Sequence, residues 1–439
     1  MTSETANAPA PGQGAGVRSK LLPGVLDAGF ASLATFAAGL AAVAVFDEAD
    51  LGVYAVFFVA FTLGQLVAYF LVYVPAEIVA VGRIGPERLT IFDDSLRIGI
   101  MPSLAGASVV FAATITTAPI ASPGLSIGLT ATAWIATLLS PTQDHVRRTL
   151  HVADRSWHAA VMSTTQFLVS GIAIVVMLVV DAPAAWVPFG ALALANLVSL
   201  SVGLLLVQHD RQHAEAPSHV TFHDLAVEGR WLLFQASIPV AAAFVTANII
   251  TYLAGPEAMG YAEAARIVAQ PILVLAAGLI YPLRPRAMEA ALSRDLPLSV
   301  RLEKLYVSMI IVGSVLYFAI AEAAFPWNPM QYLVPVAYEV NGLVAASIGA
   351  NVILASIFLA VNEMMAAGRA RSLFFLNALA APVRIVVATS AAFVGAFARP
   401  LSEAIGESVF IAGLLVYHRQ IYRGAPAEPT PRPETASSS

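Results

Sequence analysis

Apolar runs alternate with short polar stretches along the whole chain of 439 residues. A bilayer core about 30 Å thick needs about 20 apolar residues at a helical rise of about 1.5 Å per residue. Runs of this length predict an all-α polytopic membrane protein with twelve transmembrane helices. We place these helices at residues 21–46, 51–74, 98–121, 124–141, 159–180, 184–207, 231–254, 259–283, 305–325, 333–361, 372–397 and 400–418.

The distribution of basic residues agrees with this number of spans. Lys and Arg are retained on the cytoplasmic side of short loops. With the N-terminus in the cytoplasm, all but three of the 23 Lys and Arg residues fall in cytoplasmic segments. The three are Arg399 in an outer loop, and Arg266 and Arg384 inside predicted spans. A missed helix would reverse the alternation from that point onward, so the pattern predicts that both termini are cytoplasmic.

Composition narrows the classes of function. The chain is 58% hydrophobic and 12% charged, whereas soluble domains carry about 25% charged residues. This difference excludes a soluble enzyme. The absence of cysteine excludes disulfides, zinc–thiolate sites and thiol nucleophiles. The sequence has no Walker-type phosphate loop and no nucleic-acid motif, so we expect no cofactor, no ATP hydrolysis and no nucleic-acid partner.

Two segments, 21–75 and 229–283, share a faint pattern at an offset of 208 residues. Each reads as a long helix, a short acidic loop, a glycine and a second helix. The matching pairs are Ala34 and Ala242, Phe36 and Phe244, Gly52 and Gly260, and Tyr73 and Tyr281. Six spans in each half would relate the halves by an axis along the membrane normal. We therefore predict two pseudo-symmetric six-helix lobes that enclose a central cavity.

The predicted boundaries follow from the spans. The N-terminal lobe covers 21–207 and the C-terminal lobe 231–418, and the long polar stretch 208–230 is the cytoplasmic linker between them. The flanking segments 1–20 and 419–439 are rich in Pro, Ala, Ser and Gly, so we expect disordered cytoplasmic tails.

Three segments resemble a known family. Residues 21–58 resemble the first two helices of polysaccharide flippases, in which a short acidic loop leads into a Gly-x-Tyr start. Residues 253–271 (LAGPEAMGYAEAARIVAQP) resemble the corresponding loop of the second half, and 141–156 (PTQDHVRRTLHVADRS) resembles the connection after the fourth helix. The chain is thus similar to the O-antigen and exopolysaccharide flippase branch of the multidrug/oligosaccharidyl-lipid/polysaccharide exporter (MOP) superfamily.

This resemblance implies a MATE-like fold and a location in the bacterial cytoplasmic membrane. It implies translocation of an oligosaccharide linked to undecaprenyl diphosphate by alternating access, for surface polysaccharide biosynthesis. The expected partners are membrane lipids, the lipid-linked glycan and, in the same pathway, a glycan polymerase and a chain-length regulator. The related lipid II flippases typically have fourteen helices, and this chain has twelve predicted spans.

Other functions stay open at this stage. Drug-exporting relatives typically carry a functional carboxylate inside the N-terminal lobe, and Asp27 is the only deep candidate, so a cation-coupled multidrug exporter is the first alternative. The second is a membrane glycan polymerase or glycosyltransferase, although such enzymes usually have large outer loops with acidic groups. A nonenzymatic scaffold for a cell-wall complex is a further alternative.

Two arginines inside spans are candidate substrate-binding residues. An ionised side chain in the hydrocarbon region costs at least about 2.5–3.5 kcal/mol, so each needs a partner or a purpose. Arg384 lies near the predicted middle of its span and suits the oxygens of a diphosphate, or it pairs with Asp27 or Glu407. Arg266 lies in the outer third of its span and contacts substrate, or pairs with Glu263 one turn before it.

Uncharged polar residues and one carboxylate inside spans are candidates for coupling or for the cavity wall. Asp27 binds a coupling ion or proton, or forms a salt bridge or a hydrogen bond between lobes. The other candidates are Gln235, Asn248, Gln270 and Asn351. Buried amides of this kind usually hydrogen-bond to neighbouring helices. Glu403 and Glu407 share a helix face near the outer end of the last span, and we expect them at the membrane interface.

The eight histidines all fall in predicted cytoplasmic segments. His209 and His213, and His219 and His223, have the spacing of a helical metal site, but QHDRQH is not a metalloprotease signature and Pro217 interrupts a continuous helix. We therefore predict histidines in solvated or headgroup-facing loops and no metal site.

Overall fold

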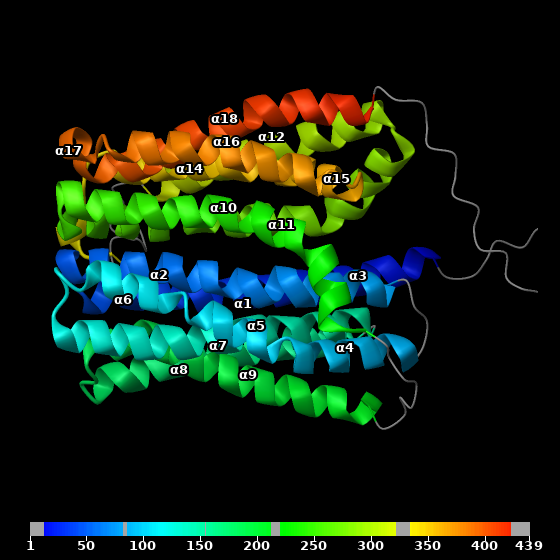
Figure 1. Cartoon of the computed structure of the whole chain (residues 1–439), viewed down its shortest axis with the longest axis horizontal. Coiled ribbons are helices and arrows are strands. Elements are labelled where there is room, and N and C mark those ends of the chain that lie inside the picture. Colours follow the sequence, from blue (N-terminus) through cyan, green and yellow to red (C-terminus); the bar gives the residue numbers. More distant parts are fainter. Residues whose placement is uncertain (1–12, 82–85, 154, 212–219, 322–333, 423–439) are drawn as a thin grey trace, which may run out of the picture.

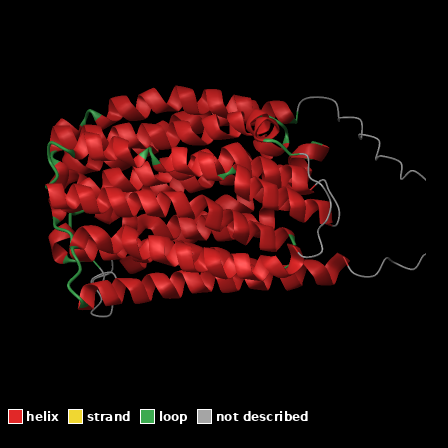
Figure 2. Cartoon of the chain, turned by 60° about the horizontal axis from the view of Figure 1, so that its bottom comes forward, coloured by secondary structure: helices red, strands yellow, loops and turns green. Residues whose placement is uncertain are grey.

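The computed structural model describes residues 13–81, 86–153, 155–211, 220–321 and 334–422. Helices joined by short loops make up this part of the chain, as Figure 2 shows. The first half consists of α1 Gln13–Val45, α2 Glu48–Ala68, η1 Tyr69–Tyr73, α3 Val74–Val81, α4 Pro86–Ile98, α5 Ile100–Ala107, α6 Val110–Thr117, α7 Pro123–Val152, α8 Ser156–Val179, η2 Ala184–Trp186 and α9 Val187–Arg211.

The second half begins near the residue at which the repeat predicts it. It consists of α10 Phe222–Ala254, α11 Pro256–Ser293, α12 Leu296–Ala321, η3 Val336–Tyr338, α14 Leu343–Ser356, α15 Phe358–Ala366, α16 Ala370–Ala388, α17 Ala391–Val394, η4 Gly395–Phe397 and α18 Ala398–Ile421. Helices α1–α9 fill one half of the bundle and α10–α18 the other (Figure 1).

The described residues contain twelve helical segments that are long and apolar enough to cross a membrane, which confirms the predicted all-α, twelve-span architecture. The spans differ at their ends. The ninth begins at Leu296 rather than near 305, and the tenth begins at Leu343 rather than near 333. The predicted linker 208–230 is wrong in its last part, because Thr221 and Asp224 form a capping box from which α10 starts at Phe222. Residues 212–219 of the linker lie outside the described residues.

The two ends of the bundle differ, and both names below refer to Figure 1. Helix α1 begins and α18 ends at one end, here called the terminal end. The turns from α1 to α2 and from α10 to α11 lie at the other, here called the turn end. Asp47 starts α2 there, because its side chain accepts a hydrogen bond of 2.8 Å from the Asp50 amide.

The two halves touch through main chain at the turn end. A Cβ atom at Gly52 of α2 would overlap the carbonyl of Pro256, and one at Gly260 of α11 would overlap the carbonyl of Glu48. Gly260 is the counterpart of Gly52 at the offset of 208 residues, and Pro256 is the counterpart of Glu48. The same contact is therefore made twice, once from each half. Only glycine permits backbones to approach this closely.

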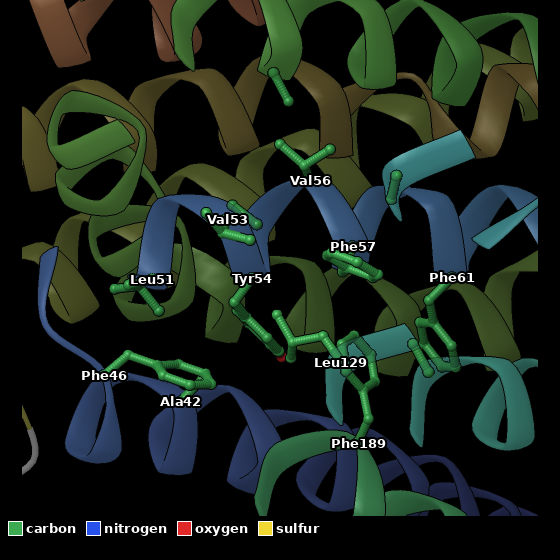
Figure 3. Close-up of a cluster of buried hydrophobic side chains, with 14 of the residues drawn as sticks. Ala42, Phe46, Leu51, Val53, Tyr54, Val56, Phe57, Phe61, Leu129 and Phe189 are labelled. Atoms are coloured by element: carbon green, nitrogen blue, oxygen red, sulfur yellow. The ribbon is translucent and has the colours of Figure 1, made fainter. Parts of the chain in front are cut away.

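Apolar side chains surround this contact. The largest buried cluster combines residues of α1, α2, α7 and α9 with Ile250 of α10 and Ile267 of α11. Figure 3 shows its centre, where Tyr54 of α2 lies between Phe46 and Phe189, with ring centroids 5.8 and 5.1 Å away. Tyr338 joins the cluster, because its hydroxyl donates to the Phe46 carbonyl at 2.7 Å. The halves are therefore closed against each other at the turn end.

Candidate functional site

A polar cavity of about 270 Å³ lies inside the first half, between α1, α2, α7, α8 and α9. Hydroxyl and amide side chains provide most of its polar groups, and one Arg and one Asp provide its charges. The lining residues are Ala31, Ser32, Thr35, Phe58, Phe61, Thr62, Gln65, Ser140, Gln143, Asp144, Arg147, Gln166 and Leu192. Asp144 and Arg147 carry opposite charges, so the lining residues have no net formal charge.

Hydrogen bonds between helices fix part of the cavity wall. Gln143 of α7 donates to Gln166 of α8 at 3.3 Å and to Ser199 of α9 at 3.1 Å. Gln166 donates in turn to Asn196 at 2.7 Å, and Asn196 donates to Ser140 at 2.7 Å. Because buried polar groups are costly when unpaired, this network holds the three helices in one register.

Gln65 differs from these amides. It lines the cavity from α2 and is half-buried, and no hydrogen-bond partner is found for its side chain among the described residues. Its amide can therefore bind a ligand without first giving up a protein contact.

Asp27 lies at the terminal side of the cavity in an ion cluster. Its carboxylate is 2% exposed and accepts hydrogen bonds from Arg147 Nη1 at 3.2 Å and from Ser163 Oγ at 2.5 Å. His151 Nε2 lies 2.9 Å from the same carboxylate. Arg147 also binds Asp144 at 2.8 Å, so this arginine connects Asp27 to the cavity lining. The sequence predicts a coupling site, a salt bridge or a hydrogen bond between lobes for Asp27. The structure contains a salt bridge, formed with Arg147 of the same half.

A second ion cluster lies near the turn end. Arg266 donates to both oxygens of Glu263, at 2.9 and 2.6 Å, which is the predicted pairing one turn apart on α11. Arg399 of α18 also donates to the fully buried Glu263, at 2.5 Å. The Arg266 guanidinium lies 4.6 Å from the ring centre of Phe58, which lines the cavity. One ring thus separates this cation from the cavity.

Arg384 is buried in the second half and pairs with Glu407. Its guanidinium on α16 donates to the Glu407 carboxylate on α18, which is one of the two partners predicted for it. Arg384 is 7% exposed and Glu407 5% exposed, so the expectation of an interfacial Glu407 is wrong. Gly406 lies directly against the Arg384 side chain and leaves room for it. Arg384 does not line the cavity of the first half.

The remaining predicted polar residues make contacts between or within helices. Asn351 is buried on α14 and donates to the Ala269 carbonyl of α11 at 2.9 Å. Asn248 donates to Phe244 of its own helix at 2.8 Å. Gln235 is buried, and its main-chain carbonyl accepts a hydrogen bond from the Asn377 side chain at 3.0 Å. Gln270 is half-buried, and no hydrogen bond of its side chain is found in the described part of the chain. None of these four residues lines the cavity of the first half.

The prediction that the histidines lie in solvated loops is wrong for three of them. His145 is fully buried, stacks on Tyr73 at a centroid distance of 4.3 Å and lies 2.7 Å from Ser95 Oγ. His151 contacts Asp27, and His418 is buried beside Glu363. The helices α7 and α18 extend beyond their apolar runs, so residues expected in loops are helical and packed. His209, His213 and His219 have side chains outside the described residues.

Arg147, Arg399 and Glu363 are among the charged residues that the hydropathy pattern does not single out. Arg147 and Arg399 lie close to helix ends and were assigned to loops, although both are less than 9% exposed. The partner of Arg147 is 120 residues away, and that of Arg399 is 136 residues away. Only the packing of helices brings these pairs together.

Comparison with solved structures identifies the fold. An inward-facing multidrug resistance MATE family transporter of the MOP superfamily matches with a TM-score of 0.67 and 15% identity, covering 89% of this chain and 94% of that chain. A MOP superfamily transporter from Pyrococcus furiosus, reported to have a binding pocket of reverse polarity, matches with a TM-score of 0.65, 13% identity and coverages of 92% and 95%. An outward-facing MATE family transporter matches with a TM-score of 0.62, 13% identity and the same coverages. No family model and no curated protein matches the sequence. The chain thus has the twelve-helix, MATE-like fold of MOP superfamily transporters.

Proposed function

We propose that the protein is an alternating-access flippase for an oligosaccharide linked to a polyprenyl diphosphate. The observation that carries this proposal is the cavity of the first half, whose hydroxyls and amides suit the hydroxyl groups of sugars. Its Arg147 is a cation within reach of a ligand and is shared between two carboxylates, Asp144 and Asp27. The lining residues carry one positive and one negative charge, so their net charge does not favour a cationic drug over a neutral glycan.

Alternating access requires one closed end and one end that opens. The contact of Gly52 with Pro256 and of Gly260 with Glu48 supports the turn end as the closed one in this conformation. Arg266 and Arg384, which we predicted to bind the diphosphate, are held by Glu263 and Glu407. In this proposal Arg147 makes the first contact with the diphosphate, and the other two arginines reach it only if the carboxylates release them.

The orientation and partners belong to the same proposal. In this proposal the terminal end of the bundle faces the cytoplasm, because helix ends there carry basic residues, such as Arg294 after α11 and Arg369 before α16. The membrane is the bacterial cytoplasmic membrane, and a glycan polymerase and a chain-length regulator act on the exported glycan.

A cation-coupled multidrug exporter is the second candidate, and the Asp27 cluster favours it. A buried carboxylate that contacts a histidine can exchange a proton or a cation during transport. Asp27 is already paired with Arg147, which weakens its attraction for a cationic drug.

The two candidates are separated by reconstitution in proteoliposomes. One assay follows movement of a fluorescently labelled lipid-linked oligosaccharide between leaflets, read by a membrane-impermeant quencher, and the other follows uptake of ethidium. We expect flipping of the oligosaccharide lipid and no ethidium transport. Gln65→Leu should slow flipping about two- to tenfold, the value of one lost hydrogen bond of about 0.5–1.5 kcal/mol.

The matched control is Thr165→Val, which removes a polar group from a half-buried position of α8 outside the cavity. It should leave flipping unchanged. Ethidium transport without movement of the oligosaccharide lipid would establish the exporter in place of the flippase.

A further inference from the structure

A cluster of metal-ligating side chains lies in the second half, away from the cavity. Glu303 of α12, Glu363 of α15 and His418 of α18 each offer one ligand atom, and these atoms lie within 4.8 Å of one another. His418 Nε2 is 2.6 Å from Glu363 Oε2 and 3.5 Å from Glu303 Oε1. The three helices meet here near the terminal end of the bundle (Figure 1).

Among the described residues, His418 is the side chain that forms ion pairs in this cluster, and when protonated it neutralises one of the two carboxylates. No Lys or Arg of the described part of the chain forms an ion pair with Glu303 or Glu363. The corresponding end of the first half differs, because an arginine, Arg147, pairs with Asp27 there. Two close carboxylates without an arginine favour a bound cation, since buried charges are paired or coordinate metals.

An unpartnered oxygen points to the same conclusion. Glu363 is fully buried, and its Oε1 atom has no hydrogen-bond partner among the described residues. Its other oxygen, Oε2, accepts from Ser299 Oγ at 2.8 Å and from Tyr422 hydroxyl at 2.7 Å. Carboxylates that bind metals are commonly held by such outer hydrogen bonds.

We propose that Glu303, Glu363 and His418 form a binding site for a divalent transition metal ion, for which Zn²⁺ is the probe. An imidazole with two carboxylates suits Zn²⁺ and its neighbours rather than Na⁺ or Mg²⁺, which prefer oxygen ligands alone. Ligand atoms about 2.0–2.2 Å from a tetrahedral Zn²⁺ lie about 3.3 Å apart, which is close to the 3.5 Å between His418 Nε2 and Glu303 Oε1. His418 and Glu363 are hydrogen-bonded at 2.6 Å, so these two ligand atoms move apart when the ion binds. Glu303 is 29% exposed and gives the ion access from outside, with water as the fourth ligand.

The bound ion links α12, α15 and α18 and so stabilises the second half. This site does not depend on the proposed cargo, because none of its residues lines the cavity.

The test uses the full-length protein, purified with a tag that contains no histidine. We expect one equivalent of Zn²⁺ to bind by calorimetry and to raise the thermal unfolding midpoint. Co²⁺ in place of Zn²⁺ should give the visible absorption of a four-coordinate site. Glu363→Gln and His418→Gln should each abolish Zn²⁺ binding and the Co²⁺ absorption. Ser299→Ala should weaken binding about 10–100-fold, as expected for the loss of a hydrogen bond to a metal ligand.

His223→Gln is the matched control, because His223 is exposed at the start of α10. It should bind Zn²⁺ as the unmodified protein does. If the buried substitutions prevent folding, Glu303→Gln provides the test at the partly exposed ligand. The proposal is overturned if the unmodified protein binds no stoichiometric Zn²⁺, or if folded Glu303→Gln binds it with unchanged affinity and spectrum.

Discussion

The pair formed by Arg384 and Glu407 permits a quantitative test of why a charge lies inside this bundle. Both side chains are less than 9% exposed, so water cannot replace the missing partner when one is removed. Breaking a buried pair from one side costs about 3–5 kcal/mol, whereas replacing both partners by well-packed neutral residues is often neutral or stabilising. We therefore expect Arg384→Met and Glu407→Gln each to lose about 3–5 kcal/mol, and the double variant to regain most of that loss.

Unfolding in mixed micelles, followed by the fluorescence of the five tryptophans, measures these changes. The control is Arg97→Gln, which removes the cation of a surface pair with Asp93 at 3.6 Å, where Arg97 is 79% exposed. Such a pair is worth at most about 1 kcal/mol. Additive losses in the double variant would refute the explanation, because contacting residues must show a coupling energy.

The same variants separate structure from substrate binding. If Arg384 serves only to neutralise Glu407, the stable double variant transports normally. If it also binds the diphosphate, the double variant folds but does not flip the oligosaccharide lipid.

Three further perturbations test the other contacts. Gly52→Ala should separate the halves at the turn end, because its methyl group overlaps a carbonyl. Met259→Cys introduces the only thiol of the chain, and labelling of this thiol should increase when Gly52→Ala is added. Unchanged labelling would contradict the closed contact. Glu263→Gln should cost at least about 3–5 kcal/mol in the same micelle assay, since Arg266 and Arg399 both lose their common partner, and a loss below about 1 kcal/mol would mean that water reaches them. Asp27→Asn should remove any dependence of transport on an imposed pH gradient, and a retained dependence would exclude Asp27 as the coupling group.

The hydropathy pattern predicted the number and order of spans because a membrane helix has a minimum apolar length. The repeat placed Gly52 and Gly260 at equivalent positions, and the structure brings them together. The pattern failed near helix ends. His418 and Arg147 follow apolar runs, but their helices continue and pack against neighbours, so both are buried.

The partners of charged residues were predictable only where they are close in sequence. Glu263 and Arg266 lie one turn apart, and their pairing was expected. The ligand cluster at Glu363 joins three helices, and the contact of Arg399 with Glu263 joins residues 136 positions apart. The wall of the cavity likewise depends on how five helices pack, which hydropathy does not encode.

The meeting of Gly52 and Gly260 involves backbone atoms, and this has a consequence for how such a protein can diversify. A barrier built from main chain makes no demand on the chemistry of the molecule that is carried. Residues of the cavity wall such as Gln65 can therefore change to suit a new cargo while the turn end stays closed. A change at either glycine, in contrast, damages the barrier for every cargo, because each one fits against the opposite half.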